Sequence, residues 1–266
     1  MSSVVFLSLG HLGIGVAGTL LFISKAVGIK FFRFNAGLAF VLLLIALAFR
    51  PESTSSAVSE TLALGTFVLA ASALLVYWVT IGRVGARFRP VLLWMTVVGG
   101  AVSLVAQAIS FSAIDAGSPA SLTVASFVSS AALLGSTCTA MILGHWYLVL
   151  PSMDVFHLQS IVKLHIGATV VRLVVVAIVI GVALASWESP SGAGYAQYVG
   201  SLEGVFLWQR VLFGLGAPMV LSYLTWETAK IQSTQSATGI LYVDFFTVIV
   251  GEVLAKYLLV ATRVPV

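Results

Sequence analysis

The sequence predicts an all-α integral membrane protein: a polytopic bundle of about eight transmembrane helices that forms one domain over residues 1–266. Two observations on composition support this fold class. Of the residues, 60% are hydrophobic and only 8% are charged, whereas a soluble domain carries about 25% charged residues. The third observation is that the hydrophobic residues fall into stretches of about 20 residues, the length that a helix needs to cross a bilayer. A soluble domain is therefore excluded, and the lipid bilayer is the first expected partner.

Eight stretches are long and apolar enough to be predicted as spans, and short connections join most of them. They cover roughly residues 3–28, 35–50, 58–82, 90–113, 120–150, 160–186, 202–225 and 239–262. The second span is the shortest, and an alternative start at Phe31 would lengthen it. The longest polar connection, residues 186–204, is rich in serine and glycine, which is typical of a loop.

Basic residues are distributed unevenly between the two sets of connections. Most of them follow the first, third, fifth and seventh spans: Lys25, Lys30, Arg33, Arg83, Arg87, Arg89, Lys163 and Lys230. The other set carries Arg50 and Arg263. By the positive-inside rule, the first set faces the cytoplasm and both termini lie on the non-cytoplasmic side. The net charge of +4 then reflects topology in a bacterial plasma (inner) membrane, and no nucleic-acid partner is expected.

Small residues occur at spacings that let helices approach closely. Gly13 and Ala17 in the first span are separated by about one helical turn, and Gly99 and Gly100 lie together in the fourth span. This pattern predicts close helix–helix packing at these positions, and not a ligand site.

The stretch GHWYLVLPSMDVFHLQSIVKLH, residues 144–165, contains three of the four histidines. Pro151 ends the fifth span, so His145 lies about one and a half turns inside that end, and His165 lies about one turn inside the start of the sixth. Consecutive spans are usually neighbours, so the two imidazoles are expected at similar depth near the cytoplasmic face. Two such donors are typical of the axial ligands of a b-type haem, and they could instead line a quinone pocket.

Other residues of this stretch have several alternative roles. His157 lies in the turn and could be a second ligand, a partner of a haem propionate or a proton relay, and Asp154 could exchange protons with water. Together with Asp154, the three histidines could also provide four donors to zinc or copper. The structural alternative is that Trp146 and Tyr147 anchor the helix at the membrane interface, where histidine is also tolerated.

Charged residues near the centres of two spans form a second candidate site. Arg172 lies in the middle of the sixth span, and Glu252 and Lys256 share one face of the eighth. Asp154, shortly before the sixth span, is assigned to the same buried charge network. A charge at the bilayer centre costs about 3 kcal/mol or more. We therefore expect Arg172, Glu252 and Lys256 to face the bundle interior and neutralise one another, either as a proton or ion path or as a helix–helix ion pair.

Three further ionisable groups lie on these spans. Arg210 lies near the outer end of the seventh span, and its long side chain is expected to reach the membrane surface. Asp244 lies near the inner end of the eighth span and is expected to cap its helix or pair with Lys230. His165 and Arg172 are seven residues apart and share one face of the sixth span, which predicts a single interior column of polar groups.

The leading functional prediction is a membrane subunit of an electron-transfer or quinone-linked complex that binds one haem b through His145 and His165. Because the chain has little soluble mass, partner subunits or a homo-oligomer would complete that complex. The alternatives are a small-molecule or proton transporter that uses the buried charges, and a non-catalytic scaffold subunit. No glycine-rich phosphate loop, HExxH or GxSxG motif occurs, so a nucleotide-driven pump or a hydrolase is not expected.

Overall fold

The computed structural model describes residues 1–51, 58–83, 87–114, 119–150, 153–186 and 194–266. Within these ranges the regular structure is helical and no strand occurs. Eight helical spans are long and apolar enough to cross a membrane, which confirms the predicted all-α class of integral membrane protein. Pro151 and residues 187–193 of the predicted long connection lie outside the described residues.

The observed helices lie close to the predicted spans. Seven spans are single helices: α1 (Ser2–Thr19), α2 (Ile29–Ala48), α3 (Val58–Thr80), α4 (Arg89–Ile114), α5 (Ala120–Val149), α6 (Phe156–Ser186) and α10 (Thr234–Thr262). The remaining span combines α8 (Val205–Val211), the π-helical η2 (Leu212–Gly216) and α9 (Ala217–Lys230). Two short helices, η1 (Lys25–Val27) and α7 (Tyr195–Val199), lie in connections.

The first span ends earlier, and the second begins earlier, than the sequence predicts. After α1 the chain turns through η1, where the Ser24 side chain accepts a hydrogen bond from a backbone N–H of the turn. Gly28 follows with a φ of 99°, a conformation that favours glycine, and α2 begins directly after it at Ile29. The alternative start at Phe31 is therefore closer to the observed boundary than residue 35.

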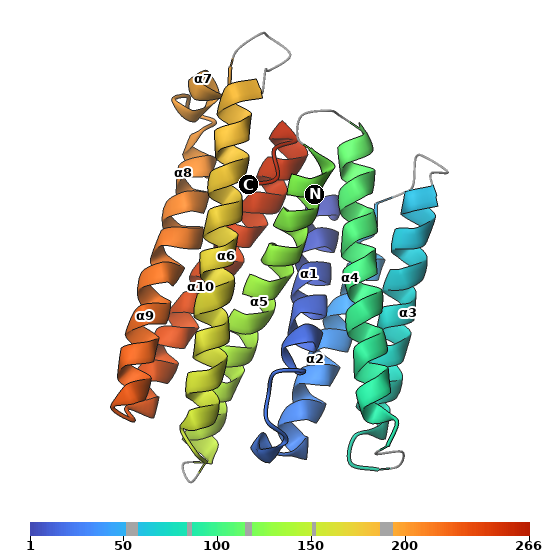
Figure 1. Ribbon diagram of the computed structural model, residues 1–266, viewed down its shortest axis with the longest axis vertical. Coiled ribbons are helices and arrows are strands. Elements are labelled where there is room, and N and C mark those ends of the chain that lie inside the picture. Colours follow the sequence, from blue (N-terminus) through green and yellow to red (C-terminus); the bar gives the residue numbers. More distant parts are fainter. Residues whose placement is uncertain (52–57, 84–86, 115–118, 151–152, 187–193) are drawn as a thin grey trace.

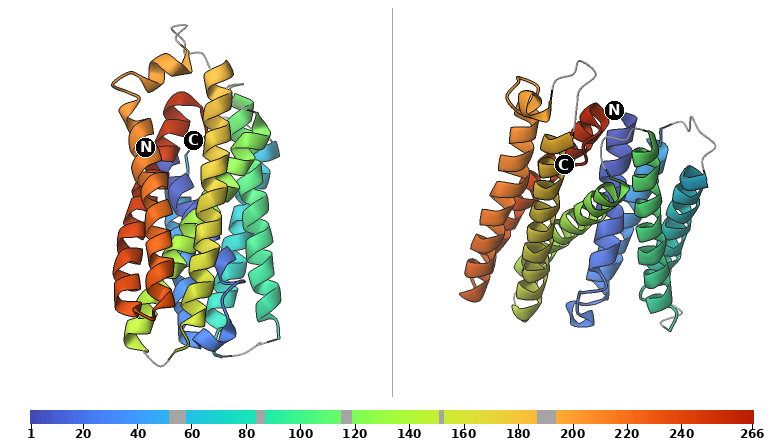
Figure 2. Two further views of the ribbon diagram at one scale, coloured as in Figure 1. Left: turned by 60° about the vertical axis from the view of Figure 1, so that its left-hand side comes forward. Right: turned by 45° about the horizontal axis from the view of Figure 1, so that its top comes forward.

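α5 crosses the middle of the bundle at a tilt, with α1 to α4 on one side and α6, α8, α9 and α10 on the other (Figure 1). Figure 2 shows the same central position from two other directions. In an apolar stretch of 18 residues within α5, 83% of the residues are buried, a larger share than in the corresponding stretch of any other described span. Its sequence explains this position, because many of its residues are alanine, serine, threonine or glycine and leave room for helices on every side.

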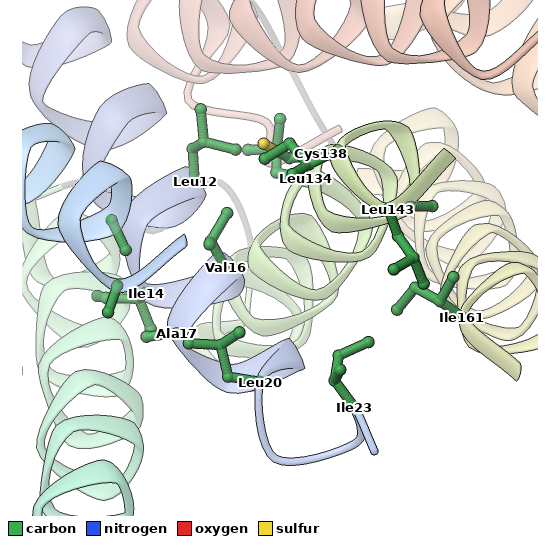
Figure 3. Close-up of a cluster of buried hydrophobic side chains, with 14 of the residues drawn as sticks. Leu12, Ile14, Val16, Ala17, Leu20, Ile23, Leu134, Cys138, Leu143 and Ile161 are labelled. Carbon is green, nitrogen blue, oxygen red and sulfur yellow. The ribbon is translucent and has the colours of Figure 1, made fainter. Parts of the chain in front are cut away.

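The largest buried core lies around α1 and α5 (Figure 3). Leu12 and Val16 of α1 belong to this core together with Leu134 of α5. Two glycines permit the contact, because a Cβ at Gly135 would lie 2.1 Å from the main-chain carbonyl carbon of Gly15. The backbone of α1 therefore lies directly against α5.

The predicted packing role of the other small residues is confirmed. A Cβ at Gly13 would lie 2.8 Å from the side chain of Leu43 on α2. One at Gly100 would lie 2.8 Å from Ile14 on α1, and one at Gly99 would contact α3. These positions hold α2, α3 and α4 around α1, on the side of the bundle away from α6.

The two ends of the bundle differ in charge. One end contains the connections between α1 and α2, α3 and α4, α5 and α6, and α9 and α10. We call it the basic end because of the basic residues that it carries: Lys25, Lys30, Arg33, Arg83, Arg87 and Lys230. Both termini lie toward the opposite end (Figure 1). The cytoplasmic orientation of the basic end and the identity of the membrane stay predictions from the sequence.

Candidate functional site

Glu252 on α10 is the centre of a buried ionic cluster. Arg172 on α6 donates two hydrogen bonds to its carboxylate, from Nε to Oε1 at 2.9 Å and from Nη2 to Oε2 at 3.2 Å. Lys256, one turn further along α10, donates to Oε2 at 3.3 Å. Arg172 and Glu252 are fully buried, and the Lys256 side chain is 2% exposed. The prediction that these three residues face the interior and pair with one another is confirmed.

Arg210 on α8 belongs to the same cluster, so the prediction that it reaches the outer membrane surface is wrong. Its Nη2 donates to Glu252 Oε1 at 2.6 Å, and both side chains are fully buried. Two long guanidinium groups from different helices therefore share one carboxylate oxygen.

The π-helical segment η2 positions Arg210. In a continuous α-helix the Gly214 carbonyl would accept a hydrogen bond from residue 218, but Pro218 has no N–H. Arg210 Nη1 donates to that carbonyl instead, at 3.0 Å. Gly251 on α10 lies against the same turn, and a Cβ there would lie 2.2 Å from the Gly214 Cα. The two glycines thus let η2 approach α10 closely enough for Arg210 to reach Glu252, and π-helical turns are frequent at functional sites.

A hydroxyl group of α5 joins the cluster to α1. Ser130 Oγ lies 2.5 Å from Glu252 Oε2, 2.6 Å from Lys256 Nζ and 3.2 Å from His11 Nδ1. His11 is fully buried, and its ring packs edge-on against Phe127 with centroids 4.8 Å apart. If Ser130 donates its one proton to the carboxylate, His11 must donate from Nδ1, and its Nε2 is then an acceptor. That Nε2 is buried and has no protein partner.

The cluster contains more cationic side chains than carboxylates. Three cations contact the single carboxylate of Glu252: Arg172, Arg210 and Lys256. The main-chain oxygen of Val266 accepts from Arg172 Nη2 at 3.2 Å and offsets part of the positive charge. Burial of several charged side chains is costly unless each charge is compensated by its partners. We call the following residues the Glu252 cluster: His11, Ser130, Arg172, Arg210, Glu252 and Lys256.

A second buried pair links α6 and α10 nearer the basic end. His165 Nε2 lies 2.7 Å from Asp244 Oδ2, and both side chains are fully buried. The predicted pairing of Asp244 with Lys230 is wrong, because Lys230 binds Glu227 at the surface, 2.6 Å away. The reason is depth: Asp244 lies about 15 Å along α10 from its start, whereas Lys230 ends α9 at the basic end.

The hydrogen bonds around His165 require a proton between it and Asp244. Thr137 Oγ1 on α5 lies 2.9 Å from His165 Nδ1 and 2.8 Å from the Leu133 carbonyl oxygen. If Thr137 donates to that carbonyl, Nδ1 carries a hydrogen, and if Thr137 donates to Nδ1, the hydrogen of the neutral ring is on Nε2. In both cases the contact between Nε2 and Asp244 needs one proton between them. Nε2 and Oδ2 share that proton. Oδ1 of Asp244 is buried with no protein partner.

The two buried centres are stacked along the same helix faces. Asp244 and Glu252 are about two turns apart on α10, as are His165 and Arg172 on α6, so the centres lie about 11 Å apart along the bundle. Hydroxyl groups of α5 line both centres: Ser126, Ser130, Ser136 and Thr137. We call the two centres and these hydroxyls the polar column. The predicted interior column on α6 is confirmed, although with partners that the sequence does not identify.

The predicted site residues of the α5–α6 connection do not join this column. His145 is exposed on α5, with Nδ1 3.0 Å from the hydroxyl of Tyr242 on α10. His157 is partly buried at the start of α6, with its ring beside that of Phe156. Asp154 is exposed and accepts from the Phe156 N–H at 2.9 Å. The assignment of Asp154 to the buried charge network is therefore wrong.

Trp146 and Tyr147 fasten the connection between α5 and α6 to the bundle. The Trp146 ring meets that of Phe31 on α2 edge-on, with centroids 5.8 Å apart. The Tyr147 side chain is buried, and its hydroxyl donates to the Asp154 carbonyl and accepts from the Leu158 N–H. Both aromatic residues thus have packing roles, on faces of α5 other than the one that carries His145.

The residues present do not fit a haem held by His145 and His165. Iron needs one free ring nitrogen from each histidine, and both nitrogens of His165 are bonded to protein groups. His145 lies on an exposed face of α5. Among the described residues, no group of three or more histidine, cysteine, aspartate or glutamate side chains is placed to hold a metal ion. The zinc or copper arrangement with Asp154 is therefore wrong.

No protein-family model matches the chain, and no curated protein matches it significantly. The polar column is therefore the feature of the chain from which a function can be inferred. Several of its members are not among the predicted site residues: His11, Ser126, Ser130, Ser136, Thr137, Arg210 and Asp244. The signal that reveals part of this set is the recurrence of hydroxyl residues along one stretch of α5, at 126, 129, 130, 136 and 137.

Proposed function

We propose that the chain transports protons across its membrane, alone or coupled to a small solute, through the polar column between α5, α6 and α10. The observation that carries this proposal is the stacking of the His165–Asp244 pair and the Glu252 cluster inside the helical spans. Ionisable groups at such depth are costly, and they are typical of proton relays in pumps and transporters.

The column contains groups that can hold and pass on a proton. The His165–Asp244 pair holds one proton between a nitrogen and an oxygen 2.7 Å apart. In the Glu252 cluster, Ser130 lies within hydrogen-bond distance of Lys256 and His11. Of the three cations that contact Glu252, Lys256 is the one that can release a proton, because arginine stays protonated in proteins. Each centre can therefore change its protonation without an extensive rearrangement of its partners.

Val248 and Thr169 lie at a level between the two centres. Val248 is fully buried on α10, about one turn from each of Asp244 and Glu252. On α6 the same level is occupied by Thr169, whose hydroxyl donates to the His165 carbonyl at 2.9 Å. A proton would cross this level only when water enters or the helices move. Transport by alternating access requires that the buried centres can be reached separately from the two ends of the bundle.

A purely structural role, as in a scaffold subunit, accounts less well for the column. A buried ion pair that only fixes helix register is expected to have its polar atoms hydrogen-bonded. Three buried polar atoms of the column have no protein partner: His11 Nε2, Arg210 Nε and Asp244 Oδ1. No geometric feature favours the haem- or quinone-binding subunit, which stays a prediction from the sequence.

Proton flux into proteoliposomes tests the proposal. The purified chain is reconstituted with a pH-sensitive dye inside the vesicles, and a potassium gradient with valinomycin imposes an inside-negative potential. We expect acidification of the lumen well above that of protein-free vesicles. Asp244→Asn and His165→Gln keep side-chain size and polarity but remove the shared proton, so each is expected to lower the rate at least tenfold. Glu227→Gln, which alters an exposed ion pair at the basic end, serves as the matched control.

Two results would contradict proton transport. One is a wild-type rate no greater than that of empty vesicles, with and without a gradient of candidate solutes. The other is an unchanged rate in both variants when size-exclusion profiles show that they are folded. If the variants only impair assembly or folding, and no flux occurs in the wild type, the scaffold function is favoured.

A further inference from the structure

A cavity of about 410 Å³ lies at the basic end of the bundle, away from the polar column. It is formed by the segment after α1, η1, the start of α2, the end of α3 and the start of α4. None of its described lining residues belongs to the Glu252 cluster or to the His165–Asp244 pair. Its volume falls in the range of about 300–1,000 Å³ that is typical of small-molecule sites.

The wall of the cavity is largely apolar. Leu20 and Leu93 are buried in it, and Phe32 adds an aromatic face. Trp94 stands at its rim and is 56% exposed. An apolar wall that opens on an exposed tryptophan at the end of a span suits a hydrocarbon chain that enters from the bilayer, because tryptophan is favoured at the level of lipid headgroups.

Two cationic side chains contribute to the same cavity. Arg89 is the first residue of α4, and its Nη2 donates to the Thr80 carbonyl at the end of α3, at 3.1 Å. This bond holds the guanidinium in place, while its Nε is buried with no protein partner. Lys25 lines the cavity from η1 and is exposed. The cavity therefore combines an apolar wall with two positive groups, one of which has an unused donor.

Charge around the cavity favours an anionic ligand further. Other basic residues are exposed at the same end of the bundle: Lys30, Arg33, Arg83 and Arg87. Clusters of basic residues next to a membrane span attract acidic lipid headgroups. The first turn of α4 adds backbone N–H groups that favour a negative charge near Arg89.

We propose that this cavity binds one acidic phospholipid. The headgroup phosphate accepts hydrogen bonds from the Arg89 guanidinium and from Lys25, and one acyl chain lies along Leu93 and Phe32 past Trp94. The bound lipid fills the space between α1, α2, α3 and α4 and joins the ends of these helices. This site is independent of proton transport, since it shares no residue with the polar column.

Native mass spectrometry of the detergent-purified chain, titrated with phosphatidylglycerol, tests this site. We expect one lipid to bind more tightly than the rest, and at least fivefold more tightly than phosphatidylcholine. Arg89→Gln is expected to weaken that first binding event at least fivefold. Lys25→Gln changes an exposed residue, keeps the fold, and is expected to weaken it about threefold. Arg87→Gln alters an arginine at the same end that does not line the cavity, so it is the control and is expected to leave binding within twofold of the wild type.

Three outcomes would overturn the proposal. Equal affinity for phosphatidylglycerol and phosphatidylcholine would show that the cations do not select a charged headgroup. Equal losses in Arg87→Gln and Arg89→Gln would show a diffuse surface effect and not a built site. Displacement of the lipid by millimolar inorganic phosphate would assign the cavity to a free anion. The proton flux of Arg89→Gln is expected to match the wild type, so failure of this site and failure of the transport proposal are distinguishable.

Discussion

Arg210 Nη2 lies 2.6 Å from Glu252 Oε1 in the interior of the bundle, and a glycine–glycine contact makes this pair possible. Gly214 and Gly251 bring the π-helical turn of the seventh span against α10, and Pro218 leaves the Gly214 carbonyl free to accept from the same guanidinium. The π-helical turn in the seventh span and the absence of a side chain at Gly251 thus place the Arg210 guanidinium in the interior. The sequence predicts this group at the membrane surface.

Substitution of Gly251 tests this relationship. Gly251→Ala places a Cβ 2.2 Å from the Gly214 Cα, so η2 must move away from α10. We expect a loss of about 1–3 kcal/mol of stability, the usual cost of overpacking, measured by thermal unfolding in detergent. The control is Gly239→Ala on the same helix, where a Cβ would meet nothing within 4 Å. Equal unfolding temperatures for the two variants would show that the contact is not tight.

The balance of charge in the Glu252 cluster gives a second prediction. Glu252→Gln leaves three cations without their carboxylate, and removal of one partner of a buried ion pair costs about 3–5 kcal/mol. The double variant Glu252→Gln with Arg210→Gln removes one of those cations and is expected to recover part of the loss. Denaturant unfolding of both variants provides the measurement. A double variant that is less stable than the single one would contradict the account of charge in this cluster.

The proton assigned to the His165–Asp244 pair can be observed directly. In ¹⁵N-histidine-labelled protein, we expect both ring nitrogens of His165 to be close to a proton at neutral pH, with the Nε2 resonance shifted by the short contact to Asp244. Comparison with His165→Gln assigns the signals. Thr137→Val removes the hydroxyl at Nδ1 and is expected to shift that resonance alone. An Nε2 without a nearby proton in the wild type would contradict the shared proton.

The haem prediction is tested by absorption spectroscopy. Protein expressed with haem supply and purified intact is expected to give a flat reduced-minus-oxidised spectrum, because both nitrogens of His165 are bonded to Thr137 and Asp244. A sharp pair of b-type bands that disappears in His145→Ala and His165→Ala would instead show that the α5–α6–α10 contacts rearrange to bind iron. In that case the electron-transfer function would be favoured over transport.

The sequence predicts depth along a helix well, because the rise per residue is fixed at about 1.5 Å. Arg172, Glu252 and Lys256 are therefore correctly placed near the middle of the bundle and facing inward, where the cost of exposing charge to lipid requires them to be. Depth does not specify the direction in which a side chain points around its helix. Depth alone pairs His145 with His165, whereas in the structure His145 lies on an exposed face and His165 contacts Asp244.

Two features of the described residues follow from the sequence: eight helices long and apolar enough to cross a membrane, and central charges that face the interior. Both reflect the cost of placing polar groups in hydrocarbon. Which charges meet depends instead on how the helices pack. Asp244 binds His165 and not Lys230, and Arg210 joins Glu252, because helices far apart in sequence are brought together by small residues on α5 and by Gly214 and Gly251. Partner choice depends on helix rotation and approach, which are properties of the packed bundle and not of any one span.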